Sequence, residues 1–428
     1  MRRHPQSLHL ALGCALLALA SAPALSAQGR AVVLQGGTII PVDGPVITRG
    51  SVVMRDGKIV SVGSNVAVPA GAEVIDVSGK YVMPGLVDAM TSLGISNSDM
   101  NEASDPLAPQ LRVSESFNPF GDFATGQVGP LRMKELLSGG VTTMYIAPAD
   151  AAVIGGQGAV VKTAGPDLAS LIIRDPASID MTLGEQPKKA ASQKQRDPAT
   201  RMAEVALLRQ MLVRAQEYER NKAATPTLPR DLGLEALGRL LRREIPARLQ
   251  ANSPGDIRTA MRVAEEFKFD LIIDGGAAAQ VHQAALAARG IPVVLGQVSH
   301  PFVSNEEIPD KSEYPPVDEG TAAKLTAAGV KTAIASFSRA FGSLAPAGSA
   351  KWLLLDAGIA TGYGMSEADV LKAVTLVPAE ILGVAQRLGS LTPGKDADVL
   401  VLDGPPLSVK SWVERVYVGG TLVHTRQP

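Results

Sequence analysis

The chain has 428 residues, of which 46% are hydrophobic and 19% charged, a composition typical of a folded globular protein and not of a disordered one. This length is sufficient for two or three domains. The 41 basic and 42 acidic residues leave a formal net charge of −1, which gives no electrostatic basis for binding nucleic acid or an anionic membrane.

Residues 1–27 have the pattern of a secretory signal peptide. Arg2 and Arg3 form a basic start, an apolar run extends from Leu8 to Ala20, and small residues close the segment. A membrane anchor would need a longer apolar span. We therefore expect an exported protein, periplasmic or extracellular, without membrane attachment after cleavage. Cleavage removes two basic residues and no acid, so the mature balance is 39 basic against 42 acidic residues, or −3.

The only cysteine, Cys14, lies inside this segment. The exported protein is therefore predicted to have no intrachain disulfide and no thiolate ligand for a metal.

Short strands are predicted at both ends of the mature chain. Residues Ala31–Asp76 alternate apolar and polar side chains, and Asp56-Gly57 between two such runs is a strong hairpin signal. Strand and turn patterns return in Gly389–Gly404 and in Val413–Thr425. Both ends are therefore predicted to be β-structure.

Between these ends, apolar strand-like runs alternate with helical patterns, which indicates a parallel sheet with crossover helices. Helices are predicted over Asp256–Glu266, Ala277–Ala288 and Thr200–Lys222. Glycine-rich Ile154–Gly158 is interpreted as a loop at the active-site face, and it lacks the Gly-Lys-Ser/Thr of a phosphate-binding loop. The predicted strands are Val141–Ile146, Ala159–Lys162, Ala247–Gln250, Leu271–Ile273, Val293–Leu295 and Thr332–Ala335.

The stretch from Lys80 to Ile95, KYVMPGLVDAMTSLGI, resembles the opening of the barrel in the amidohydrolase superfamily, usually written PGLIDAHTHLG. Other segments, such as GGVTTMYIAP and GKDAD, are similar to imidazolonepropionase-like members, and the resemblance covers nearly all of the mature chain. It implies an α/β fold, a (β/α)8 TIM-like barrel over residues 85–388. One β-sandwich, built from residues 28–84 and 389–428, would flank this barrel.

The resemblance also implies where a zinc or iron ion would be bound and where the base that deprotonates the attacking water would stand. At each of these positions the family's histidine or aspartate is replaced. A register shift of one residue would put Ser336 or Ser338 at the position of the base. The degenerate positions are Met90, Ser92, Gln250 or Asn252, Gly275 and Phe337.

A count of histidines agrees with this interpretation. Two of the five histidines lie in the predicted signal peptide, and the others are His282, His300 and His424. His282 falls in a helical pattern and His424 in a terminal strand, whereas His300 follows a predicted strand. A water-activating site needs about three protein ligands, so no metal cofactor is expected.

Three residues remain as pocket candidates: Lys162, Glu185 and His300. Lys162 and Glu185 lie where the family resemblance is intact, and each has an alternative interpretation as an ordinary strand-end lysine or loop glutamate. Acid–base catalysis by Glu185 with His300, without a metal, is a further alternative that no spacing supports.

Two functional hypotheses follow. The first is a pseudoenzyme that binds a small-molecule ligand or pairs with an active homologous amidohydrolase. The second is an active hydrolase of C–N bonds in cyclic amides or peptide-like substrates, with a non-standard site. The sequence leaves open whether the chain is an enzyme.

Overall fold

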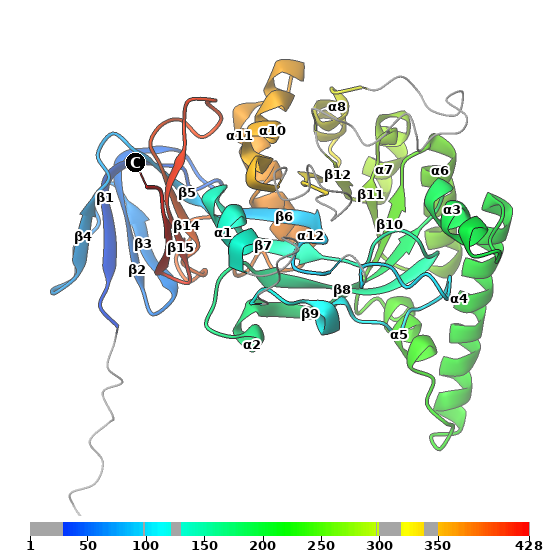
Figure 1. Ribbon diagram of the computed structural model, residues 1–428. Coiled ribbons are helices and arrows are strands. Elements are labelled where there is room, and N and C mark those ends of the chain that lie inside the picture. Colours follow the sequence, from blue (N-terminus) through cyan, green and yellow to red (C-terminus); the bar gives the residue numbers. More distant parts are fainter. Residues whose placement is uncertain are drawn as a thin grey trace, which may run out of the picture.

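A computed structural model describes residues 29–96, 99–120, 130–296, 298, 318–337 and 350–427. Figure 1 shows two regions side by side, one made of strands from both chain ends and the other of strands surrounded by helices. The predicted signal peptide and His300 lie outside the described residues.

Both chain ends contribute to one eight-stranded sheet with the order β16-β15-β14-β5-β1-β2-β3, in which β4 also pairs with β1. The two halves join where β5 and β14 pair antiparallel. The sheet curls, because Ile59 of β3 exchanges backbone hydrogen bonds with Gly394 and Lys395, just before β14. Its strands are β1 Val32–Ile39, β2 Ile47–Arg55, β3 Lys58–Gly63, β4 Glu73–Asp76, β5 Tyr81–Pro84, β14 Val399–Leu402, β15 Val413–Val418 and β16 Thr421–Thr425.

The hairpin predicted at Asp56-Gly57 is confirmed. Arg55 pairs with Lys58 across the turn, and the two turn residues have φ angles of 51° and 77°. Two consecutive positive φ angles are typical of the tight turns that match the twist of paired strands, and Asp-Gly adopts them readily.

The second sheet has eight strands in the order β13-β12-β11-β10-β9-β8-β7-β6 and forms the barrel. All neighbours are parallel except β8, which is antiparallel to both β7 and β9. The strands are β6 Leu86–Thr91, β7 Val141–Ile146, β8 Ile154–Lys162, β9 Ile172–Thr182, β10 Ala247–Ala251, β11 Leu271–Gly275, β12 Val293–Leu295 and β13 Thr332–Ile334.

A short set of contacts closes the barrel between its first and last strands. Ser336 donates to the Asp88 carboxylate from its backbone N–H at 2.9 Å and from its hydroxyl at 2.5 Å. The Phe337 N–H then donates to the Met90 carbonyl oxygen at 3.0 Å. The end of β6 is thereby fixed to the segment that follows β13.

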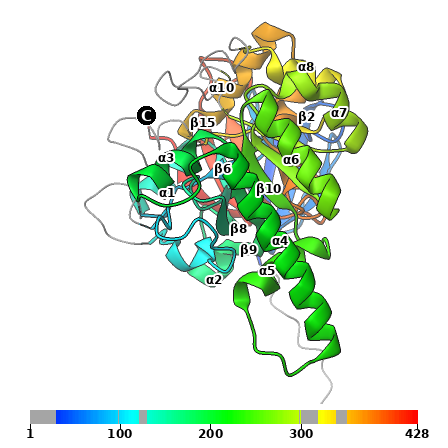
Figure 2. The ribbon, with the colours of Figure 1, turned by 90° about the vertical axis from the view of Figure 1, so that its right-hand side faces the viewer.

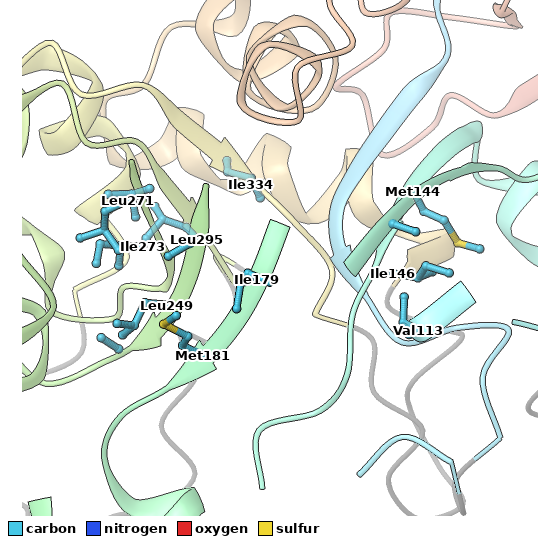
Figure 3. Close-up of a cluster of buried hydrophobic side chains, with 14 of the residues drawn as sticks. Val113, Met144, Ile146, Ile179, Met181, Leu249, Leu271, Ile273, Leu295 and Ile334 are labelled. Carbon is cyan, nitrogen blue, oxygen red and sulfur yellow. The ribbon is translucent and has the colours of Figure 1, made fainter. Parts of the chain in front are cut away.

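Helices cover the outer face of the barrel. Alternate side chains of its strands, such as Ile179, Leu249 and Ile273, belong to the same buried cluster as helix residues and are drawn together in Figure 3. Helix α6 begins with Ser253 as its N-cap and Pro254 in its first turn, and it links β10 to β11.

The described helices are α1 Pro130–Ser138, α2 Leu168–Leu171, α3 Glu185–Gln193, α4 Arg201–Ala224, α5 Leu232–Leu241, α6 Pro254–Phe267, α7 Gln283–Arg289, α8 Thr321–Ala327, α10 Leu353–Ile359, α11 Glu367–Ala373 and α12 Leu376–Ile381. Single 3₁₀ turns are η1 Val113–Ser116, η2 Ala279–His282 and η4 Ala360–Tyr363. Within the described ranges, no helix has the length and apolar character that a bilayer crossing requires.

One local expectation is wrong, and one strand was missed. Ile154–Gly158 opens strand β8 and is not a loop; glycine is needed there because a Cβ at Gly158 would collide with the Tyr145 side chain inside the barrel. Strand β9, over Ile172–Thr182, was not predicted at all.

Candidate functional site

The positions that the resemblance assigned to metal and base all lie at the carboxyl ends of parallel barrel strands. In barrel enzymes this is the end at which active sites are built. Met90 is on β6 and Ser92 directly follows it, Gln250 is on β10 and Asn252 follows it, Gly275 ends β11, and Phe337 follows β13.

The polar groups at these positions have partners within the protein. The Ser92 hydroxyl donates to the Ala147 carbonyl oxygen at 3.3 Å, and the Gln250 amide donates to Asp150 at 3.2 Å. The Asn252 side-chain oxygen accepts from the Ala277 N–H at 3.3 Å, and a Cβ added at Gly275 would collide with that same amide. These side chains therefore fasten strand ends to the adjacent loops.

Phe337 occupies the position assigned to the catalytic base, and its side chain is buried. Its φ angle of 48° lies in the left-handed region, which non-glycine residues seldom adopt. The neighbouring Asp88–Ser336 contacts hold this backbone in place. Burial raises the pKa of Asp88 to about 6, although the hydrogen bonds from Ser336 lower it in part.

The donor chemistry at these positions does not fit zinc or iron. They offer a thioether, a hydroxyl, carboxamides, a glycine and a phenyl ring, whereas zinc is bound by thiolate, imidazole and carboxylate. Across the part of the chain that the structure describes, no group of three or more histidine, cysteine, aspartate or glutamate side chains is arranged to hold a metal ion.

A charged network lies inside the barrel, deeper than these strand ends. It was not predicted from the sequence. Arg248 of β10 is almost completely buried and donates to Asp274 at 2.7 and 2.9 Å. Its guanidinium also lies 3.8 Å from the centre of the Tyr145 ring. The Tyr145 hydroxyl donates to Asp180 at 2.7 Å, and burial raises the pKa of Asp180 to about 7 despite the nearby Arg248.

This network could have been found from one signal, the alternation of side chains along the strands. Arg248 and Asp274 each lie one position away from a residue of the outer apolar cluster, which directs them into the barrel. One Arg248 nitrogen, Nη1, has no hydrogen-bond partner.

Glu185, one of the predicted pocket candidates, begins α3 just beyond the end of β9. Its carboxylate accepts from Lys188 at 2.6 Å and from Arg201 at 3.2 Å. Arg201 in turn lies 3.1 Å from Asp256, at the start of α6. Glu185 therefore lies on the same side of the barrel as the strand ends, within an ion-pair network that joins α3, α4 and α6.

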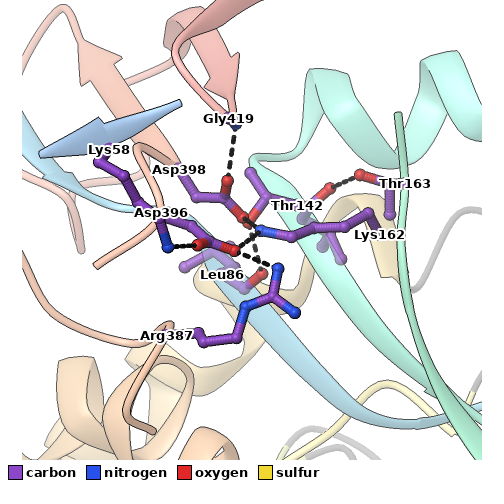
Figure 4. Close-up of polar contacts among 10 residues, drawn as sticks. Lys58, Leu86, Thr142, Lys162, Thr163, Arg387, Asp396, Asp398 and Gly419 are labelled. Atoms are coloured by element: carbon purple, nitrogen blue, oxygen red, sulfur yellow. Dashed lines mark hydrogen bonds and ion pairs between the residues drawn. The ribbon is translucent and has the colours of Figure 1, made fainter. Parts of the chain in front are cut away.

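Lys162, the second candidate, lies at the opposite end of the barrel. Because β8 is antiparallel, its last residue pairs with Thr143 near the start of β7. Figure 4 shows the Lys162 ammonium between Asp398, at 2.5 Å, and Asp396, at 3.2 Å. Lys162 therefore does not line the strand ends where the family site would lie.

This ionic cluster ties the barrel to the composite sheet. Asp396 also accepts from Lys58 at 2.7 Å and from Arg387 at 2.9 Å, and Asp398 accepts from the Gly419 N–H at 2.9 Å. Burial alone would raise the pKa of Asp396, but the three surrounding cations outweigh it and lower the pKa to about 2.

Comparisons with known proteins agree with this architecture. The sequence profile described as "Amidohydrolase family" matches residues 279–423. The structure of an amidohydrolase from Thermotoga maritima MSB8 superimposes with a TM-score of 0.83 at 34% identity, covering 92% of this chain and all of that one.

Two curated relatives match as well. Amidohydrolase tasK from Hapsidospora irregularis is 28% identical over 411 residues, which are 87% of this chain but only 39% of tasK. Imidazolonepropionase from Staphylococcus aureus (strain Newman) is 46% identical over 59 residues, 14% of each chain. The chain thus spans about two fifths of tasK, and this protein belongs to the amidohydrolase family, with similarity to imidazolonepropionases.

Proposed function

We propose that this amidohydrolase-family protein has lost the family's metal site and acts without catalysis, as a ligand-binding protein or as the partner subunit of an active homologue. The observation that carries the proposal is the chemistry of the strand ends. Ser92 and Gln250 are engaged with Ala147 and Asp150, and a buried phenyl ring stands where a base is needed.

Water activation sets the requirement that these residues fail to meet. A divalent ion lowers the pKa of bound water to about 7 only when protein ligands hold it with one position open. A carboxylate must then accept the proton, and Phe337 cannot do so. Several groups would therefore have to change together before the family's reaction could run.

The neutral strand ends are better suited to holding a small organic molecule. Met90 and Phe337 are apolar and buried just beneath the strand ends, and Asn252 is a partly exposed residue with a polar amide. Small-molecule sites combine mostly apolar walls with a few polar groups that fix orientation. This combination supports ligand binding over hydrolysis.

The alternative is an active C–N bond hydrolase with a non-standard site. Family membership favours it, and so do the amidohydrolase relatives. In that case Glu185 or His300 would be among its catalytic groups.

Hydrolysis assays separate the two functions. The purified mature protein is incubated with a panel of cyclic amides and dipeptides in the presence of zinc. A parallel incubation with a chelator is the control. We expect no chelator-sensitive hydrolysis, and none from Met90→His either, because several ligands and the base are missing together. Chelator-sensitive turnover by the wild-type protein would overturn the proposal.

Native mass spectrometry of the same preparation tests the proposed roles. A co-purified small molecule supports ligand binding, and a defined complex with a co-expressed active homologue supports the subunit role. A chain that is never found with either contradicts both roles. We also propose that the protein is exported, since residues 1–27 carry the signal-peptide pattern; N-terminal sequencing of the secreted form tests this.

A further inference from the structure

A cavity of about 600 Å³ lies between α4 and α6, on the outer side of the barrel. Both helices face the viewer in Figure 2, with α3 beside them. Four arginines line the cavity: Arg201 and Arg209 from α4, and Arg258 and Arg262 from α6. The cavity is therefore unusually rich in guanidinium groups.

Two of these arginines already have acidic partners. Arg201 lies 3.1 Å from Asp256, and Arg209 binds Glu266 through two nitrogens at 2.9 and 2.7 Å. The other two differ. Arg258 and Arg262 are exposed, and neither forms an ion pair with any residue in the described ranges.

The spacing of Arg258 and Arg262 places both on the same face of α6. Residues four apart are neighbours on a helix surface, and like charges at that spacing destabilise the helix. Arg258 and Arg262 both lie beyond the first turn of α6, so the repulsion comes from the two guanidinium groups and not from the helix dipole. An anion bound between the two guanidinium groups would relieve this repulsion.

The acidic residues of the cavity wall cannot supply that anion. Glu204 is completely buried, and one of its oxygens accepts from the Gly184 N–H at 3.0 Å. Asp256 is buried too, and its carboxylate contacts the Ser253 hydroxyl at 2.6 Å as well as Arg201. Glu266 lies near enough to Arg262 for the Arg262 charge to help lower the pKa of Glu266, but Glu266 is already bound to Arg209. The surface that faces the cavity therefore keeps an excess of positive charge.

Apolar groups complete the cavity wall. Leu183 and Val205 line it, and so does Met202, whose side chain is 79% exposed. A large exposed methionine beside unpaired arginines is suited to a ligand that is both anionic and partly apolar. Guanidinium groups bind carboxylate and phosphate through paired hydrogen bonds.

We propose that this cavity binds a small organic anion, a carboxylate or a phosphate ester with an apolar part, held by Arg258 and Arg262. The guanidinium groups of this site come from the outer helices, although Leu183 and Ser253, which also line the cavity, lie close to the ends of β9 and β10. Its occupancy does not depend on whether the barrel is catalytic.

Isothermal titration calorimetry of the full mature chain at pH 7 and about 0.1 M salt tests this proposal. Succinate and inorganic phosphate serve as the two probes, which separates carboxylate from phosphate recognition, and uncharged succinamide is the ligand control. We expect saturable binding of at least one anion and none of succinamide. Arg258→Gln and Arg262→Gln should each weaken binding by about tenfold or more, the value of a lost charge-assisted hydrogen bond.

Arg220→Gln is the matched variant, since Arg220 is an exposed arginine of α4 that does not line the cavity. It makes the same change in net charge and should leave the affinity within about twofold, because exposed charges beyond a Debye length of about 10 Å are screened. Thermal melts establish that each variant is folded. Absence of saturable anion binding by the wild-type chain, or equal weakening by Arg220→Gln, would overturn the proposal.

Discussion

At the amino-terminal end of the barrel, the Lys162 ammonium lies within 3.2 Å of two carboxylates, Asp396 and Asp398. At the carboxyl ends of the strands, Ser92 contacts a backbone carbonyl and Gln250 contacts Asp150. The amino-terminal end of the barrel holds the Gly-Lys-Asp-Ala-Asp segment that resembles the family. The carboxyl ends of the strands hold the positions at which the sequence differs from the family's pattern.

The proposed function implies that the fold and the activity of the family rest on separate residues. The ionic cluster joins the barrel to the composite sheet, so its charges have a structural role in this protein. A metal site at the strand ends, by contrast, is required only for catalysis. A chain can therefore keep the residues of the ionic cluster while the residues at the strand ends change.

The strongest test of the structural end is Lys162→Met, which removes the cation between Asp396 and Asp398. Both carboxylates are buried, and leaving a buried charge without its partner costs about 3–5 kcal/mol. We expect a loss of that size in the free energy of unfolding, measured with urea.

Lys80→Met is the control for that substitution. Lys80 pairs with Glu414 at 2.5 Å in the same composite sheet, but its side chain is 30% exposed, so the loss should be about 1 kcal/mol or less. Equal losses from the two variants would contradict the structural role assigned to the buried cluster.

Asp88→Asn probes the buried carboxylate near the strand ends. The pKa of Asp88 is raised to about 6, so the folded protein binds this proton more tightly than the unfolded chain does. The free energy of unfolding should therefore fall as pH rises from about 4 to about 6, by up to about 3 kcal/mol. Urea titrations at several pH values should find a shallower decline in the variant than in the wild type, because Asp180 and Glu204, whose pKa values are also raised, keep their own contributions.

Asp396→Asn should have the opposite pH dependence. The pKa of Asp396 is lowered to about 2, so its contribution is present above pH 4 and is lost as pH falls through 2. At pH 7 the variant should lose about 2 kcal/mol, and the difference from the wild type should shrink in acid. If the difference in the free energy of unfolding between variant and wild type grew in acid, this account of the cluster would be contradicted.

Ser92→Ala is expected to have the smallest effect. The hydroxyl makes one neutral hydrogen bond, to the Ala147 carbonyl oxygen at 3.3 Å, and its loss should cost about 1 kcal/mol. A thermal melt measures that cost. If the variant instead abolished a measurable hydrolytic activity, Ser92 would belong to a catalytic site.

Much of the composite sheet could be predicted from local sequence. Asp56-Gly57 fixes a hairpin through its own backbone preferences, and the terminal strands alternate clearly. Strand β9 could not be found in this way, because Pro176 and the charged Asp175 and Asp180 interrupt its apolar pattern. Asp180 is accommodated inside the barrel by hydrogen bonds from Tyr145, which is distant in sequence, and from Ser178.

The candidate site was predictable in place but not in detail. The family resemblance gave positions such as Met90 and Gly275, which lie at strand ends as the barrel requires. It could not give the contacts of Gln250 with Asp150, which are distant in sequence. Lys162 was a pocket candidate because it lies where the family resemblance is intact, but the antiparallel direction of β8 places it at the other end of the barrel.

The most direct test of the central claim is the metal content of the purified mature protein, measured by elemental analysis after removal of loosely bound ions. We expect zinc and iron well below one ion per chain, because the strand ends offer no imidazole, thiolate or carboxylate at the family's positions. The double variant Met90→His/Ser92→His, which places two imidazoles at one strand end, should retain more zinc than the wild type does. About one tightly bound transition metal per wild-type chain would contradict the account, and Glu185 and His300 would then be the first residues to replace.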